Sequence, residues 1–255
     1  MIRALLERLS RDRILRRRLP ASFGGAEILV SPASALKLWR RDLRRVDPWL
    51  FAAVSARVKP GSTVWDVGAN VGLFAFGAAF RAGTGGRVVA LEADPWLAEL
   101  VWRSAGDLPA DYAPVTALGA AVAAQVGIGE LALARRGRAA SHLTLATGSS
   151  QTGGTRSLRP VVTLTLDWLL ERLAPPQLVK IDVEGAEVAC LEGGARLLGE
   201  ARPELLIEVT EANVPRATAL LEGHGYRLFD AADPASPKAT RAAVWNTLAL
   251  PAERC

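Results

Sequence analysis

Short apolar runs alternate with longer amphipathic or apolar runs along most of this chain, and the pattern predicts strands and helices in turn. The predicted strands cover residues 63–67, 87–91, 115–122, a short segment from 178, 203–208 and 245–250. The predicted helices cover residues 47–58, 73–80, 95–104, 168–173 and a segment from about 186. A hairpin is expected from the β-prone segments 128–134 and 141–145, and residues 148–159 have the polar, glycine-containing composition of a loop. Alternation of this kind predicts an α/β fold with a mostly parallel sheet and helices on both faces.

The first predicted strand leads into a helix through a glycine-bearing turn that contains Gly68, Ala69, Asn70 and Gly72. Glycine lets the backbone approach a ligand closely, and the start of a helix offers free N–H groups. Glu92 stands twenty residues after Gly72, at the end of the next strand. A carboxylate at that place can accept hydrogen bonds from the two hydroxyls of a ribose.

The spacing of this turn is Asp-x-Gly-x-x-x-Gly, which differs from the Gly-x-Gly-x-x-Gly of dinucleotide-binding loops. Asp66 precedes the first glycine, where it would repel the phosphates of a dinucleotide and suit a cationic ligand. S-adenosylmethionine combines an ammonium group and a sulfonium with a ribose, so it fits both carboxylates. The alternative is an ordinary glycine-containing turn that binds no ligand.

The length of 255 residues and an apolar share of one half allow a large core. We expect a basic helical extension over residues 1–58 and one α/β domain over residues 59–255. Two cysteines and the lack of a disulfide pattern favour a reducing compartment. No apolar run has the length of a membrane span, and no signal peptide is recognisable, so a cytoplasmic protein is expected.

The net charge of +5 lies in residues 1–18, which hold seven arginines, one glutamate and one aspartate. Ile2, Leu5, Leu6 and Leu9 would share one face of a helix over this segment. Such a basic amphipathic helix suits an anionic membrane or a protein partner, although a solvated helix packed on the domain is the favoured alternative. Nucleic acid is not an expected partner, because the charge is local and no recognition motif is present.

A second informative stretch places acidic residues at the end of the strand that begins at residue 178. Lys180, Asp182 and Glu184 share the parity of a strand, so their side chains project to one side if the extended geometry persists. Ligands of open parallel sheets bind beyond the carboxyl ends of the strands, where these carboxylates would lie. The alternative is that Asp182 or Glu184 caps the following helix. The next strand ends in another carboxylate, Glu208.

Several motifs resemble, in order and spacing, those of the FkbM-type methyltransferases. The resemblance rests on Asp66-Val-Gly-Ala-Asn-Val-Gly72, Glu92 with Pro95, Thr165-Leu-Asp167, Lys180-Ile-Asp-Val-Glu-Gly-Ala-Glu187, Leu191-Glu-Gly-Gly194 and 203–208, over roughly residues 60–250. It implies a class I methyltransferase (Rossmann-like) fold, with a seven-stranded, mostly parallel sheet whose last strand is antiparallel. It also implies O-methylation of a sugar, glycan or natural-product hydroxyl, with S-adenosylmethionine as cofactor and a small molecule or glycan as acceptor.

The resemblance and the residue patterns together give a set of expected cofactor-binding residues: Asp66, Gly68, Ala69, Asn70, Gly72, Glu92, Ala93, Ala120 and Asp182. The family often has an acidic residue near the adenine after the third strand, whereas this chain has alanines over residues 120–121 and 123–124. Adenine recognition is therefore expected to depend on backbone groups or on neighbouring residues.

A hydroxyl acceptor is a weak nucleophile and needs a general base or a metal ion to help remove its proton. The candidate catalytic residues are Asp182, Glu184, Glu208 and His142. Two carboxylates without a third ligand make a weak metal site, so no metal is predicted. The alternatives are a nucleotide-linked oxidoreductase, which the missing dinucleotide motif disfavours, and a non-catalytic scaffold tethered by the basic N-terminal segment.

Overall fold

The main sheet of the computed structural model has eight strands, and the structure describes residues 7, 9–135, 137–144 and 154–254. In spatial order the strands are β13 (Lys238–Thr240), β12 (Tyr226–Asp230), β14 (Asn246–Pro251), β11 (Glu204–Glu208), β10 (Leu178–Ile181), β3 (Thr63–Val67), β4 (Arg87–Leu91) and β5 (Val115–Leu118). The strands from β11 to β5 are parallel, whereas β14 runs antiparallel to both of its neighbours. The antiparallel last strand is as expected, and β13 brings the number of strands to eight, not seven.

Helices cover both faces of this sheet. The helices are α2 (Pro48–Arg57), α3 (Leu73–Ala82), α4 (Pro95–Gly106), α5 (Leu166–Leu170), α6 (Glu187–Glu192) and α7 (Val214–Gly223). Val64 of β3 packs in the cluster formed with α2, α3 and α4, whereas Trp65 and Val67 pack in the cluster formed with α5, α6 and α7. Side chains alternate across a strand, so each central strand contributes to two cores. The predicted α/β fold, with a mostly parallel sheet and helices on both faces, is confirmed.

The N-terminal segment differs from the predicted helix over residues 1–18. Its helical conformation ends at Ser10, and β1 (Leu15–Arg18) pairs antiparallel with β2 (Glu27–Val30). Residues 1–6 and 8 of the prediction lie outside the described residues. Arg16 of β1 forms an ion pair with Glu27 of β2 at 2.7 Å, and this cross-strand contact helps to hold β1 against β2. The extension over residues 1–58 is therefore not wholly helical, and its contact with a membrane or partner remains a prediction.

The N-terminal segment also contributes to the core of the domain. Ile28 and Val30 of β2 are buried in the cluster that contains α3 and α4. Two short 3₁₀ helices, η2 (Leu36–Trp39) and η3 (Leu43–Arg45), follow β2 and lead to α2. The segment therefore packs on the same face of the sheet as α2, α3 and α4.

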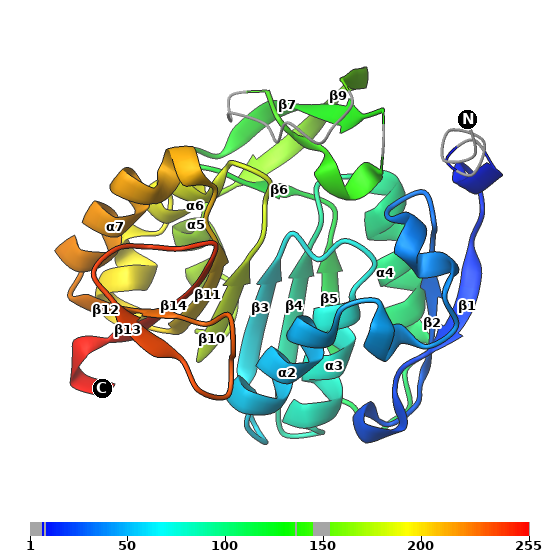
Figure 1. The fold of residues 1–255 in the computed structure, drawn as a ribbon, viewed down its shortest axis with the longest axis horizontal. Coiled ribbons are helices and arrows are strands. Elements are labelled where there is room, and N and C mark those ends of the chain that lie inside the picture. The colour runs from blue at the N-terminus through cyan, green and yellow to red at the C-terminus, as the bar shows by residue number, and fades with distance from the viewer. Residues whose placement is uncertain (1–6, 8, 136, 145–153, 255) are drawn as a thin grey trace.

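A second, four-stranded sheet lies beyond the ends of β3, β4 and β5 (Figure 1). Its order is β6 (Ala121–Val122), β9 (Thr155–Leu164), β7 (Gly127–Ala134) and β8 (His142–Leu143), and the short 3₁₀ helix η4 (Arg138–Ala140) precedes β8. The expected hairpin is present, because β7 and β8 pair antiparallel. Two expectations are wrong: the strand over 115–122 is interrupted between β5 and β6, and residues 155–159 of the predicted loop belong to β9. Residues 145 and 148–153 of those predictions lie outside the described residues.

The helix expected over residues 168–173 begins earlier, as α5, and its N-cap residue is Thr165. The Thr165 hydroxyl accepts a hydrogen bond from the backbone N–H of Trp168 at 3.0 Å. The Asp167 carboxylate instead accepts from the backbone N–H groups of Arg196 and Leu197. Among the described residues, no helix is long and apolar enough to cross a membrane.

Candidate active site

The glycine turn after β3 is shaped by close contact with the loop after β10. Gly68 has a φ of +80°, and a Cβ at this position would lie 1.8 Å from the backbone oxygen of Asp182. Gly72, with a φ of +81°, precedes α3, where a Cβ would lie 2.4 Å from the ring of Phe76. Asn70 also has a positive φ, of 54°. Both glycines are thus required for packing and backbone conformation, whether or not a ligand approaches them.

Glu92 fixes the turn from the neighbouring strand. One carboxylate oxygen accepts from the backbone N–H of Asn70 at 2.7 Å, and the other accepts from the backbone N–H of Asp94 at 2.8 Å. Each carboxylate oxygen has a second lone pair, so Glu92 retains acceptor positions for two hydroxyl donors. Burial raises its pKa to about 7, and the two backbone hydrogen bonds partly counteract this rise.

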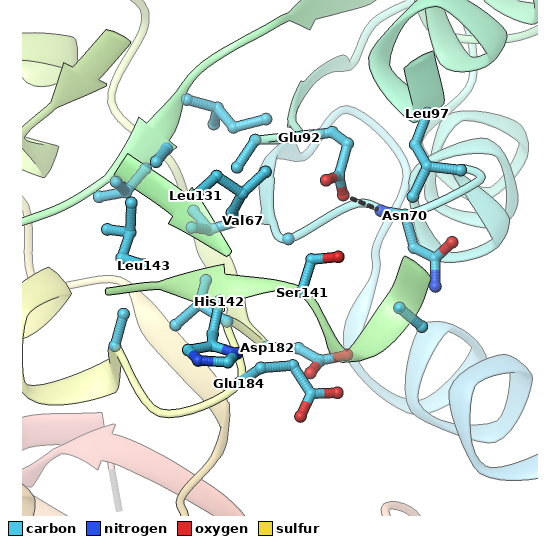
Figure 2. Close-up of a pocket in the computed structure, with 18 of the residues that line it drawn as sticks. Val67, Asn70, Glu92, Leu97, Leu131, Ser141, His142, Leu143, Asp182 and Glu184 are labelled. Carbon is cyan, nitrogen blue, oxygen red and sulfur yellow. Dashed lines mark hydrogen bonds between the residues drawn. The ribbon is translucent and has the colours of Figure 1, made fainter. Parts of the chain in front are cut away.

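Glu92 lies in a cavity, here called the Glu92 cavity, at the carboxyl ends of β3, β4 and β10 (Figure 2). Gly68, Asn70, Ala93, Ala120, His142, Asp182 and Glu184 also line it. Leu97, Leu131 and Leu143 supply apolar wall from α4, β7 and β8. The cavity therefore offers a carboxylate beside an apolar wall, and further carboxylates elsewhere along its lining.

Lys180 forms a buried ion pair next to the glycine turn. The Lys180 ammonium lies 3.2 Å from a carboxylate oxygen of Asp66, 3.4 Å from one of Asp182 and 3.1 Å from the backbone oxygen of Gly68. Burial alone would lower the pKa of Lys180, but the carboxylates of Asp66 and Asp182 raise it above its ordinary value. Lys180 therefore joins the turn after β3 to the acidic end of β10.

Asp66, expected from its position before the first glycine to meet a cationic ligand, does not line the Glu92 cavity. Its side chain is fully buried, and its second oxygen accepts from the backbone N–H of Ala75 at 3.1 Å. With Lys180 on the other oxygen, the carboxylate has partners within the protein. Asp66 anchors the start of α3 and orients Lys180.

A second recess adjoins the first along the glycine turn and is here called the Glu208 recess. Asp182, Glu184 and Glu208 line it from the sheet side, while η2, residues 46–47 and the start of α2 supply the opposite wall. Its volume is about 200 Å³. Burial, followed by repulsion from Asp182, raises the pKa of Glu208 to about 8 and that of Glu184 to about 7.

Asp182 and Glu184 line both spaces, whereas Glu208 and Ala69 line only the recess and His142 only the Glu92 cavity. Asp66 and Gly72 line neither space. The alternative that Asp182 or Glu184 caps α6 is wrong, because Ala186 is the N-cap residue and no side chain caps it.

Two residues that make contacts at the site were not predicted from the sequence. Arg138 lines the Glu92 cavity, donates to the Asp94 carboxylate and lies 4.8 Å above the ring of Trp96. The Ser34 hydroxyl donates to the Asn70 side chain. Both contacts join residues more than thirty positions apart, and neither residue belongs to a motif.

These features fit S-adenosylmethionine in the Glu92 cavity: acceptor positions on Glu92, an apolar wall, and a turn whose backbone comes close because Gly68 has no room for a side chain. Together with the fold they define a class I S-adenosylmethionine-dependent methyltransferase. The family model described as "Methyltransferase FkbM domain" matches residues 66–228. The chain belongs to this family, as the resemblance of its motifs predicts.

Solved structures similar to this chain include a methyltransferase FkbM from Methylobacillus flagellatus KT, with 15% sequence identity and a TM-score of 0.48. The match covers 83% of this chain and 60% of that chain. A precorrin-6y C5,15-methyltransferase from Geobacter metallireducens GS-15 has 15% identity, coverage of 83% and 89%, and a TM-score of 0.44. An S-adenosylmethionine-dependent O-methyltransferase from Thermotoga maritima has 13% identity, coverage of 88% and 72%, and a TM-score of 0.42. No curated protein matches the chain. In the described part of the chain, no three histidine, cysteine or acidic side chains are grouped so that they could hold a metal ion.

Proposed function

We propose that this methyltransferase transfers the methyl group to a hydroxyl of a sugar, glycan or natural product. The observation that carries the proposal is the shared wall of two spaces: the Glu92 cavity, suited to the cofactor, meets the carboxylate-lined Glu208 recess at Asp182. A reacting hydroxyl in the recess would lie next to the cofactor cavity and beside groups that can accept its proton.

Bound S-adenosylmethionine would supply a methyl group on a sulfonium, and in-line attack of the acceptor oxygen on the methyl carbon would release S-adenosylhomocysteine. The residues of the chain position and deprotonate the acceptor. In this proposal Asp182 is the general base; it lines both spaces, as Glu184 does, and it directly follows β10. Glu208, whose pKa is raised to about 8, keeps its proton at neutral pH and can donate a hydrogen bond to another oxygen of the acceptor. Positioning supplies much of the remaining rate.

Cofactor recognition is assigned to the opposite part of the Glu92 cavity. Glu92 would accept from the ribose hydroxyls, and Leu97, Leu131 and Leu143 would pack against the adenine. The backbone near Ala93 and Ala120 lines the same cavity and takes the place of the acidic residue that the family often carries after the third strand. Glu184 and His142 are secondary candidates for proton transfer.

Isotope-labelled S-adenosylmethionine and a panel of sugar, glycan and natural-product alcohols test the proposal. Asp182→Asn should lower methyl transfer about 10²–10⁴-fold, as expected for loss of a general base. The melting temperature should change little, because Lys180 keeps Asp66 as a partner at 3.2 Å. Glu99→Gln, on the exposed face of α4, is the matched control. Full activity of Asp182→Asn would contradict the assignment, and inhibition by a chelator that Mg²⁺ reverses would indicate a metal in place of a simple base.

A further inference from the structure

A third space, the arginine cleft, opens beside the two already described. Arg11, Lys37, Arg135, Arg138 and Arg156 line it, with Glu7 and Glu184 as its acidic members. Its volume is about 490 Å³. The cleft lies between the segment after β2, the turn that carries η4 and the start of β9.

The wall between the cleft and the Glu92 cavity is built by backbone contacts. The N–H of Arg138 donates to the backbone oxygen of Ala33 at 2.8 Å, and that of Ala139 donates to the oxygen of Ser34 at 3.2 Å. Gly137 has a φ of +66°, and a Cβ there would lie 2.9 Å from the Ser34 oxygen. The turn is therefore fixed against the N-terminal segment, which gives the cleft a defined shape.

Among the described residues, three of the basic side chains in the cleft have no acidic partner. Lys37 pairs with Asp47 at 3.2 Å, and Arg138 pairs with Asp94. Arg11, Arg135 and Arg156 are exposed, and within the described part of the chain their side chains form no ion pair or hydrogen bond. Guanidinium groups gathered in a recess create a positive potential that an anion relieves.

The cleft is continuous with the proposed acceptor site. Glu184 and Ala139 line the arginine cleft, the Glu92 cavity and the Glu208 recess alike. A molecule anchored in the cleft therefore passes Glu184 before it reaches Asp182. Basic side chains thus predominate in the arginine cleft, whereas carboxylates predominate in the Glu208 recess, where an anionic group would be repelled.

We propose that the acceptor is a small molecule that carries a phosphate or diphosphate group, held by Arg11, Arg135 and Arg156, with its hydroxyl in the Glu208 recess. This inference rests on the proposed function, since it concerns the acceptor of the same reaction. Guanidinium groups match phosphate oxygens in charge and in bidentate geometry, and several of them suit a group with more than one negative charge. The described lining of the cleft includes no aromatic side chain on which the bases of single-stranded RNA could stack.

Calorimetry with inorganic pyrophosphate and the full-length protein tests the inference. The variant Arg135→Gln/Arg156→Gln should bind pyrophosphate at least about tenfold more weakly than the wild type, because charge-assisted hydrogen bonds are lost. The matched control, Arg87→Gln/Arg159→Gln, removes the same charge from exposed positions outside all three spaces and should bind pyrophosphate as the wild type does. Affinity of the wild type should fall as salt is raised.

Equal pyrophosphate affinity in the wild type and the cleft variant, or no binding to the wild type at millimolar concentration, would overturn the inference. So would tighter binding of a ten-nucleotide RNA that the cleft variant loses, because the cleft would then belong to a nucleic-acid surface. S-adenosylhomocysteine binding, measured on the same proteins, should be equal in the wild type and both variants. Its absence from the wild type would count against the proposed function, whereas the pyrophosphate comparison alone decides the cleft.

Discussion

Replacement of Glu92 by alanine tests the cofactor assignment at the residue with the clearest geometry. The change removes a carboxylate that the ribose hydroxyls would share with the backbone N–H groups of Asn70 and Asp94. Hydrogen bonds to a charged group contribute about 1.5–3 kcal/mol each. Loss of one such bond therefore predicts S-adenosylhomocysteine affinity about 10- to 100-fold lower.

The same substitution has a cost in stability that must be measured separately. The two backbone N–H groups, at 2.7 and 2.8 Å from the carboxylate, lose their acceptor. An unsatisfied buried donor costs about 1–3 kcal/mol, so the free energy of unfolding should fall by a few kcal/mol. Calorimetry is therefore performed at a temperature where the variant is folded, and Glu99→Ala, on the exposed face of α4, is the control. Unchanged ligand affinity in folded Glu92→Ala would refute the ribose assignment.

The pH dependence of binding provides a second test of Glu92. Its pKa is raised to about 7 in the free protein, so the carboxyl is largely protonated below that pH and loses acceptor capacity. Hydroxyl donors favour the charged form. S-adenosylhomocysteine affinity of the wild type should therefore decrease as the pH falls from 8 to 6. In Glu92→Gln, which has no titrating group there, this decrease should be much smaller.

Gly68→Ala should destabilise the fold and abolish S-adenosylhomocysteine binding, because its Cβ would lie 1.8 Å from a backbone oxygen. The control is Gly61→Ala, since Gly61 has a similar φ of +79° but no atom within 4 Å of its Cβ position. A thermal melt of this control measures the cost of the backbone strain alone. Lys180→Met should cost about 3–5 kcal/mol of stability in chemical denaturation, because Asp66 is left buried without its cation, and the loss should diminish at acid pH as that carboxyl takes up a proton. Burial and neighbouring carboxylates raise the folded-state pKa of Glu208 to about 8, so its contribution to stability is complete below pH 4.5 and is lost as the pH rises through 8. Glu208→Gln should therefore reduce the decline in unfolding free energy between pH 5 and 8, and an unchanged decline would contradict the raised pKa.

Local patterns were sufficient to predict the parts of the site that lie at the ends of strands. The strand–glycine–helix run around Gly68 and the apolar strand before Glu92 depend on residues close in sequence, and parallel strands bring their carboxyl ends to one edge. The acidic residues after β10 were located in the same way. The resemblance of the motif at 180–187 to the FkbM family added the cofactor class.

Contacts between distant segments could not be predicted. Asp66 has the local sequence expected of a ligand-facing carboxylate, but Lys180, 114 residues later, neutralises it inside the protein. The arginine-rich segment before residue 18 fits a helical pattern, yet pairing with β2 makes its last four residues a strand. β9 begins in residues with a polar loop composition and gains its stability from the ladder with β7.

The most direct test of the account is a crystal structure of the protein with S-adenosylhomocysteine. We expect the ribose hydroxyls within hydrogen-bond distance of Glu92, the adenine against Leu97 and Leu131, and the sulfur turned toward Asp182 at the edge of the Glu208 recess. Binding outside the Glu92 cavity, or a sulfur directed away from the recess, would contradict the proposed site of methyl transfer.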